Sequence, residues 1–197
     1  MNDTRQTLVD LLVFSLLVAI GVAGRWGQPE WCFTPTAAAA IFAGRYFNRL
    51  WIAALVPMAI LAISDTRLSA YDSYGVLIAT YAALAFPAVL GKWLGNHRGG
   101  WSAAWRWGVC GLVPALVFFV VTNFAVWVFE SDYPRTAAGL LACYTAAVPF
   151  FRWMLMGDVF YLVVLFGAAA LAGVRWTAPS RLQPQPATAR ENYLKRA

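Results

Sequence analysis

The stretch GLVPALVFFVVTNFAVWVF at residues 111–129 contains no charged side chain. A helix needs about 20 apolar residues to cross the hydrocarbon core of a bilayer, so this stretch, extended back to residue 107, predicts a transmembrane helix. Working outward from it, we find five further apolar runs at residues 8–24, 33–47, 50–64, 74–95 and 153–174. The sequence therefore predicts six transmembrane helices in an all-α integral membrane protein, with residues 1–176 forming a single membrane domain.

Composition supports this fold class. Of the 197 residues, 61% are hydrophobic and 12% are charged, whereas soluble domains have roughly 45–50% apolar and about 25% charged residues. The runs 33–47 and 50–64 are short for a full crossing, so they need tilt, local thinning of the bilayer or a tight hairpin. The alternative is a re-entrant pair at residues 33–64 that enters the membrane and never crosses it.

Loop charges predict which side each end faces. Six crossings place both termini and the connections 45–49 and 92–106 on one side, together with eleven of the fifteen Lys and Arg residues. Arg25, Arg67 and Arg135 lie on the other side. Because positive charge accumulates in cytoplasmic loops, we expect both termini to face the cytoplasm. The net charge of +6 is thereby explained without nucleic acid as a partner.

Two segments outside the six runs are not predicted to cross the membrane. TAAGLLACYTAAVP at residues 136–149 is too short to cross, so we expect a short extra helix in the last outer loop, lying in or dipping into the outer leaflet. Thr136 is available as its N-cap. The polar, proline-containing residues 177–197 predict a disordered cytoplasmic tail.

Ionisable and amide side chains are scarce in the apolar runs and are therefore candidates for function. Asp158 lies about two turns from the outer end of the last run, and it either contacts a ligand or forms a structural hydrogen bond between helices. Asn123 and Trp127 are four residues apart, so they share one helix face. That face is either a pocket wall or an interhelical contact. We expect alanine at position 123 or 158 to weaken ligand uptake.

Small residues four apart mark a close-packing face in the second run. Ala39 and Ala43, and Ala40 and Gly44, allow two helix backbones to approach closely. The partner is either another helix of this chain or a second protein. The latter defines an alternative function, that of an accessory or structural subunit of a larger membrane complex.

Catalytic and metal-binding patterns are missing from the sequence. The only histidine, His97, is predicted on the inner side, and Cys32, Cys110 and Cys143 have no CxxC spacing. We therefore expect no enzyme, no metal site and no cofactor; an intramembrane enzyme that uses Asp158 as acid or base is the third alternative. Whether Cys32 and Cys143 are free, bridged or ligands stays open.

Three stretches resemble a known family: FTPTAAAAIFAGRYF at 33–47, ISDTRL at 63–68, and the run from TNFAVWVFESDYPR to FYLVVLFG at 122–167. They resemble uncharacterised bacterial six-helix proteins, described as transport proteins, that are related to the substrate-binding S components of energy-coupling-factor (ECF) vitamin transporters. The resemblance covers about half of the chain. It implies an S-component-like bundle in the bacterial inner membrane that captures a small, vitamin-like micronutrient from the periplasmic side and moves it inward.

In S components the ligand lies in an outward-open cavity built from the outer loops and the last three helices. The residues of this chain that the resemblance places there are Asp65, Asn123, Trp127, Tyr133, Tyr144 and Asp158. S components often carry an AxxxA face on the inner part of the first helix for docking on the coupling subunit, whereas Ala19 and Ala23 lie at its outer end here. The expected partners are therefore the lipid bilayer, a small-molecule substrate, and either an ECF-type energising module or none.

Overall fold

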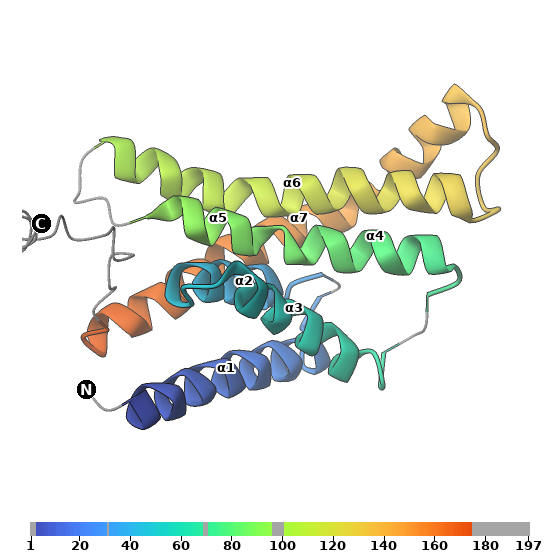
Figure 1. Cartoon of the computed structure of the whole chain (residues 1–197). Coiled ribbons are helices and arrows are strands. Elements are labelled where there is room, and N and C mark those ends of the chain that lie inside the picture. Colours follow the sequence, from blue (N-terminus) through green and yellow to red (C-terminus); the bar gives the residue numbers. More distant parts are fainter. Residues whose placement is uncertain (1–2, 31, 69–70, 96–100, 175–197) are drawn as a thin grey trace, which may run out of the picture.

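The computed structural model describes residues 3–30, 32–68, 71–95 and 101–174. Their regular secondary structure is entirely helical (Figure 1). The helices are α1 (Asp3–Trp26), α2 (Thr36–Tyr46), α3 (Leu50–Ser64), α4 (Tyr74–Ala85), α5 (Pro87–Leu94), α6 (Trp101–Phe129) and α7 (Ala137–Leu171). The predicted tail at 177–197 and His97 lie outside the described residues.

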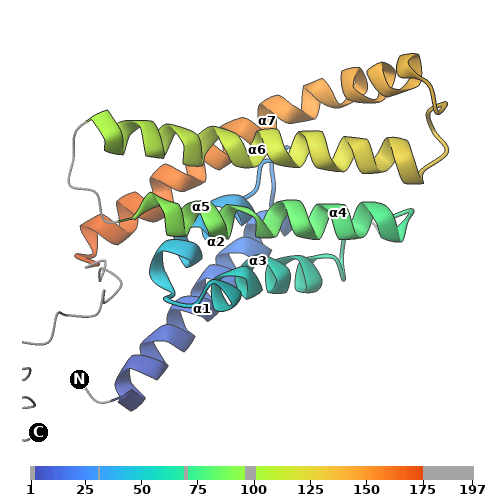
Figure 2. The same cartoon turned by 45° about the horizontal axis from the view of Figure 1, so that its top comes forward.

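In the described part of the chain, four helical segments are long and apolar enough to cross a membrane: Thr4–Trp26, Tyr74–Leu94, Ala103–Phe129 and Ala137–Leu171. The second combines α4 and α5, which follow one line (Figure 2) and are separated at Phe86, before Pro87. With 11 and 15 residues, α2 and α3 extend about 16 and 22 Å at 1.5 Å per residue. Both are shorter than the roughly 30 Å hydrocarbon core.

Large apolar side chains cover the outside of these helices. Between 22% and 39% of the most apolar part of each long segment is buried within the chain. Leu12 in α1, Leu116 in α6 and Val163 in α7 are among the exposed apolar residues. A helix that is apolar on its outer and inner faces alike is typical of a membrane bundle, because lipid replaces water around it.

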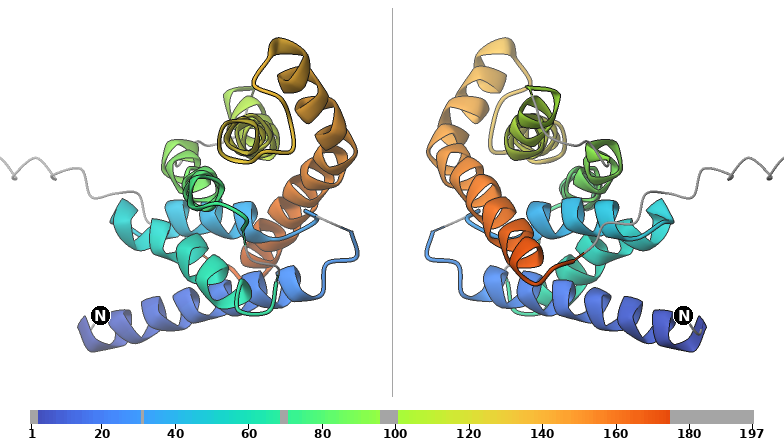
Figure 3. Two further views of the ribbon diagram at one scale, coloured as in Figure 1. Left: turned by 90° about the vertical axis from the view of Figure 1, so that its right-hand side faces the viewer. Right: turned by 90° about the vertical axis from the view of Figure 1, so that its left-hand side faces the viewer.

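Helix α2 lies in the middle of the bundle and packs against α1, α3, α4, α5 and α7 (Figure 3). Every residue from Thr36 to Gly44 is buried. The closest approach is to α5: a Cβ atom added at Gly44 would lie 2.0 Å from the carbonyl oxygen of Ala88, and one added at Gly91 would lie 2.0 Å from that of Ile41. Glycine at both positions therefore lets the two backbones touch.

The small-residue face of the second apolar run is thus inside the molecule. Ala39, Ala40 and Ala43 have no exposed surface, and Gly44 meets the backbone of α5. Its partner is a helix of the same chain, so this face is not available to a second protein.

The expected short helix at 136–149 is not a separate element. Residues 137–149 form the first turns of α7, which continues without a break to Leu171 and contains Pro149. Thr136 does cap the helix, since its Oγ1 accepts a hydrogen bond of 3.1 Å from the Gly139 amide. A proline removes one backbone hydrogen bond and often bends a membrane helix without ending it, and the first part of α7 leans away from the line of the rest (Figure 1).

This correction moves Asp158 much deeper into its helix. It lies 21 residues after Ala137, the first residue of α7, which is about six turns at 3.6 residues per turn. From the sequence alone, Asp158 is predicted about two turns from the outer end of the last helix. At 35 residues, α7 is about 52 Å long, well above the roughly 30 Å of the hydrocarbon core.

The connections α1–α2, α3–α4 and α6–α7 lie toward one end of the bundle, and the start of α1 lies toward the other (Figure 1). At that other end, Lys92 Nζ donates to the carbonyl oxygens of Phe47 and Asn48, the second at 2.6 Å. Arg106 donates to the Trp93 carbonyl at 2.5 Å. Basic side chains thus satisfy carbonyl groups at the ends of α2 and α5, where cations are favoured by the helix dipole.

Candidate functional site

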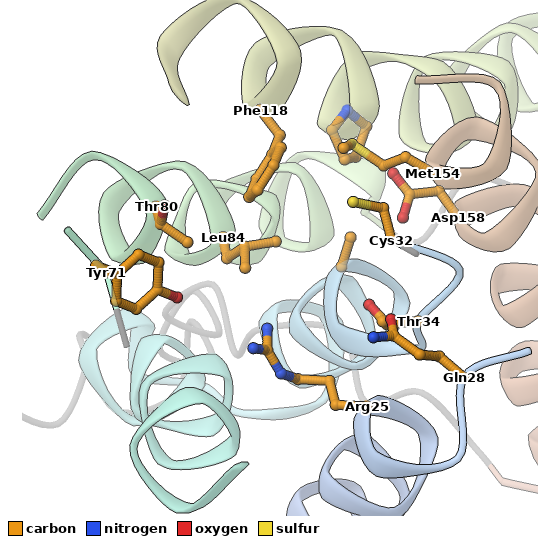
Figure 4. Close-up of a pocket in the computed structure, with 12 residues that line it drawn as sticks. Arg25, Gln28, Cys32, Thr34, Tyr71, Thr80, Leu84, Phe118, Met154 and Asp158 are labelled. Carbon is orange, nitrogen blue, oxygen red and sulfur yellow. The ribbon is translucent and has the colours of Figure 1, made fainter. Parts of the chain in front are cut away.

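A cavity of about 190 Å³ lies between α2, α4, α6 and α7, beneath the α1–α2 and α3–α4 connections (Figure 4). Its wall combines polar side chains with aromatic and apolar ones, the mixture typical of small-molecule sites. The lining residues are Arg25, Gln28, Cys32, Thr34, Ala37, Tyr71, Thr80, Leu84, Pro114, Phe118, Met154 and Asp158.

Asp158 supplies a carboxylate to this wall from α7. Its side chain is 6% exposed. The preceding Gly157 allows α7 to approach the α1–α2 connection closely, because an added Cβ atom would lie 3.1 Å from the Cα atom of Phe33 and 3.2 Å from the amide nitrogen of Thr34. A side chain at 157 would push α7 away, so glycine there positions Asp158 against the loop.

A backbone amide from α6 donates to the Asp158 carboxylate. The donor is Ala115, the residue after Pro114. A proline within a helix disturbs the local i to i−4 hydrogen-bond ladder, which leaves neighbouring backbone groups available to other partners. Among the described residues, the carboxylate forms no ion pair with a basic side chain. A deeply buried carboxylate with a neutral donor alone is costly, and such groups in membrane segments are functional candidates.

Arg25 is the other charged residue on the wall, and its charge is already neutralised. It forms an ion pair of 2.8 Å with Asp65, and the two side chains are 14% and 17% exposed. Tyr81 donates a hydrogen bond of 3.2 Å to the second Asp65 oxygen, and Tyr71 also hydrogen-bonds this carboxylate. Burial and the nearby Asp65 charge raise the pKa of Tyr71 to about 12, so its hydroxyl keeps its proton and can donate.

This ion pair joins the end of α1 to the end of α3, and we expect it to stabilise the cavity wall. Replacing Arg25 by Gln leaves the partly buried Asp65 without its cation, which costs about 1–3 kcal/mol. The melting temperature of the purified protein should therefore fall, and adding Asp65→Asn should recover part of the loss. Arg67→Gln is the matched control, because Arg67 is exposed over the Trp26 ring. Equal melting temperatures for the Arg25 and Arg67 variants would contradict this role.

Cys32 lies between the two charged residues of the wall. Its φ angle is +69°, an uncommon backbone conformation for a residue other than glycine. Cys32, Cys110 and Cys143 are all free thiols, so no disulfide joins Cys32 to Cys143. Burial raises the pKa of the Cys32 thiol; the positive charge of Arg25 opposes this shift and the negative charge of Asp158 adds to it.

A raised pKa means less thiolate, and the thiolate is the reactive form. We expect N-ethylmaleimide to modify Cys32 of the folded protein more slowly than free cysteine at neutral pH, with a rate that still increases in the alkaline range. Peptide mapping by mass spectrometry measures the rate, and the SDS-denatured chain is the control. Modification of Cys32 at the rate of free cysteine would show that its thiol is open to water.

The predicted site residues do not all meet at this cavity. Asp158 lines it, and Asp65 lies behind the wall as the partner of Arg25 and Tyr71. Four others are not among the lining residues and lie around the outer part of α6 and α7: Asn123, Trp127, Tyr133 and Tyr144.

Hydrogen bonds show what three of these four side chains do. Asn123 donates to the Phe119 carbonyl of its own helix at 2.8 Å. Tyr144 of α7 donates to the Val120 carbonyl of α6 at 2.7 Å, and Trp127 donates to the Pro134 carbonyl at 3.0 Å. The last two bonds tie α6 to α7 and to their connection. Tyr133 is partly exposed in that connection.

Sequence reasoning missed most of the wall. The sequence predicts Arg25 on the outer side but gives it no role in the site. Thr80 and Leu84 of α4 were not singled out, although their spacing of four places both on one helix face. Phe118 and Met154 lie in uniformly apolar runs, where no sequence signal distinguishes them. Within the described residues, no group of three or more His, Cys, Asp or Glu side chains could hold a metal ion.

The fold and the cavity define a class: the described residues form a helical bundle with four potential membrane spans and a partly polar cavity between the helices. The chain belongs to a family described as a family of unknown function (DUF6580), whose model matches residues 5–182. No curated protein matches the chain, and neither does any solved structure.

Proposed function

We propose that this chain is a transport protein of the bacterial inner membrane. It binds a small organic micronutrient, vitamin-like in character, from the periplasmic side and moves it inward in the manner of the S components that its sequence resembles. The observation that carries the proposal is the cavity beneath the α1–α2 and α3–α4 connections, with the buried Asp158 carboxylate on its wall. A hollow with few, converging polar groups between helices is a typical ligand site.

The orientation follows from the charges at the two ends of the bundle. The end of α2, the start of α3, the end of α5 and the start of α6 lie opposite the cavity connections (Figure 1). These helix ends carry Arg45, Arg49, Lys92 and Arg106, and positively charged ends stay in the cytoplasm. The cavity then faces the periplasm. In the six-crossing topology α2 and α3 both traverse the membrane. Helix α2 is short, yet it is surrounded by other helices, and the carbonyl groups of Phe47 and Asn48 just after it accept from Lys92.

The volume of the cavity limits the ligand. A cavity of about 150 Å³ holds benzene, so about 190 Å³ admits a molecule with one ring or a short chain and a few polar substituents. Larger vitamins with several rings require the α1–α2 and α3–α4 connections to move apart.

The alternative function as an accessory subunit requires the small-residue face of α2 to be free for a second protein. The small residues of α2 contact α5, so they cannot bind a second protein without opening the bundle. No other observation favours this alternative. An energising partner of the ECF type, or none, remains part of the transport proposal.

Reconstitution of the purified chain alone tests the proposal. Proteoliposomes are incubated with the small-molecule fraction of a bacterial cell extract, washed, and analysed by mass spectrometry. We expect at least one compound to be enriched relative to protein-free liposomes. Enrichment that requires an added ECF-type module identifies a coupled transporter, and enrichment without it identifies a solitary one. Enrichment in neither preparation contradicts transport.

A further inference from the structure

We infer that the cavity selects a small organic cation, whose protonated amine or equivalent group lies against Asp158. This inference rests on the proposed function and specifies the substrate class of the same site. It starts from the balance of charge on the wall.

Two of the lining residues carry formal charge, and their situations differ. Arg25 is paired with Asp65 at 2.8 Å, and Asp65 receives two further hydrogen bonds from tyrosines. The charge of Arg25 is therefore balanced within the protein. Asp158 receives a backbone N–H from Ala115 and has no basic side chain as an ion-pair partner in the described part of the chain.

Arg25 and Asp65 balance each other, so within the described residues Asp158 is the acidic group of the wall without a partner of opposite charge. The cost of burying a lone carboxylate decreases when a cation joins it, because the charge pair is attractive in a medium of low dielectric constant. A cationic ligand supplies that missing partner. An anionic ligand would instead add a second negative charge next to Asp158, which like-charge repulsion disfavours.

The remainder of the wall is compatible with a cation that carries an apolar body. Phe118 and Tyr71 present aromatic rings to the cavity, and Met154 presents a polarisable thioether (Figure 4). Aromatic faces attract organic cations as well as apolar groups, and the thioether packs adaptably against irregular shapes. Charge is thus recognised at Asp158, and shape is recognised by the other side of the cavity.

A matched set of probes separates charge from shape. Benzylamine is protonated at neutral pH, benzyl alcohol is a neutral molecule of similar size, and benzoate is an anion on the same ring. Calorimetric titration of each probe into the purified protein gives its dissociation constant. We expect benzylamine to bind about tenfold or more tightly than benzyl alcohol, and benzoate to bind weakest.

Asp158→Asn removes the charge and keeps the shape, so we expect the preference for benzylamine to fall to about twofold or less. Asp132→Asn is the matched control, since Asp132 is an exposed acid in the α6–α7 connection, and it should retain the full preference. If Asp158→Asn fails to fold, the ranking of the three probes on the wild-type protein still tests whether the cavity prefers a cation.

Three results would overturn the inference: equal or tighter binding of the alcohol or the anion, survival of the cation preference in Asp158→Asn, or no binding of any probe at millimolar concentration. Transport is measured separately in the proteoliposomes. Cation-selective binding without uptake would remove the transport proposal and keep this inference. Uptake of a neutral or anionic compound would keep the transport proposal and remove this inference.

Discussion

Asp158→Ala is expected to weaken ligand binding and uptake strongly while the protein still folds. Within the described residues, Asp158 is the acidic group of the cavity wall without an ion-pair partner, so its loss removes the group that we assign to ligand recognition. We expect uptake of the compound enriched by the wild-type chain to fall by about tenfold or more, because a charged hydrogen bond contributes roughly 1.5–3 kcal/mol. Proteoliposome uptake and calorimetric titration measure this effect.

The stability of the same variant separates a functional role from a structural one. A buried carboxylate without a cation is destabilising in the ligand-free protein, so alanine should leave the melting temperature unchanged or raise it. A net stabilising role of the hydrogen bond that Ala115 of α6 donates to Asp158 would instead lower the melting temperature of the alanine variant. Loss of uptake together with a clearly lower melting temperature would therefore contradict the functional role.

Asn123→Ala is the matched control for this experiment. From the sequence alone, both Asn123 and Asp158 are predicted to bind the ligand. The structure separates them, because the Asn123 amide bonds to its own helix and is not among the lining residues. We expect uptake by Asn123→Ala to remain within about twofold of the wild type. A tenfold loss at Asn123 would show that the ligand extends toward the outer part of α6.

Gly91→Ala is expected to cause a large loss of stability, because the added methyl group would enter the contact between α2 and α5. The new Cβ atom would lie 2.0 Å from the carbonyl oxygen of Ile41, 2.9 Å from the Arg45 amide nitrogen and 2.9 Å from the Gly44 Cα atom. All three are backbone atoms, which cannot rotate away as a side chain can. Helices α2 and α5 must separate, at a cost of about 3 kcal/mol or more.

Gly108→Ala is the matched control for Gly91→Ala. Gly108 lies in α6 with no atom within 4 Å of an added Cβ, and alanine there improves helix propensity by up to about 1 kcal/mol. Thermal unfolding followed by tryptophan fluorescence should show a large decrease for Gly91→Ala and none for Gly108→Ala. A Gly91→Ala protein with the yield and melting temperature of the wild type would show that α2 and α5 do not touch.

The long apolar segments were predictable because length and lack of charge suffice to identify them. The run 74–95 agrees with α4–α5 to within one residue, and the run 107–129 ends with α6 at Phe129, although α6 begins six residues earlier, at Trp101. The length of α7 was not predictable in this way, because Pro149 and Arg152 interrupt its apolar sequence. The proline lies inside the helix, and the exposed Arg152 guanidinium lies 5.2 Å from the Trp153 ring, so neither ends it.

The side chains on the inward face of each helix were harder to predict from the sequence. In a soluble protein, polar residues mark the outer face, but here the outer face is apolar too, so periodicity does not reveal which side chains point inward. Asp158 was found because a charge within an apolar run is conspicuous. Phe118 and Met154 could not be found in this way. Arg25 was missed because its significance depends on Asp65, 40 residues further along the chain.

The central claim is that the cavity beneath the α1–α2 and α3–α4 connections holds a small molecule. Native mass spectrometry of the chain purified in mild detergent tests it directly, with Ala37→Trp as the comparison, since Ala37 lines the cavity and an indole there fills it. We predict one small molecule bound per wild-type chain and none bound to an Ala37→Trp variant that remains monodisperse. A wild-type chain without a bound molecule, even after incubation with a bacterial metabolite extract, would contradict the account, as would equal occupancy of the two proteins.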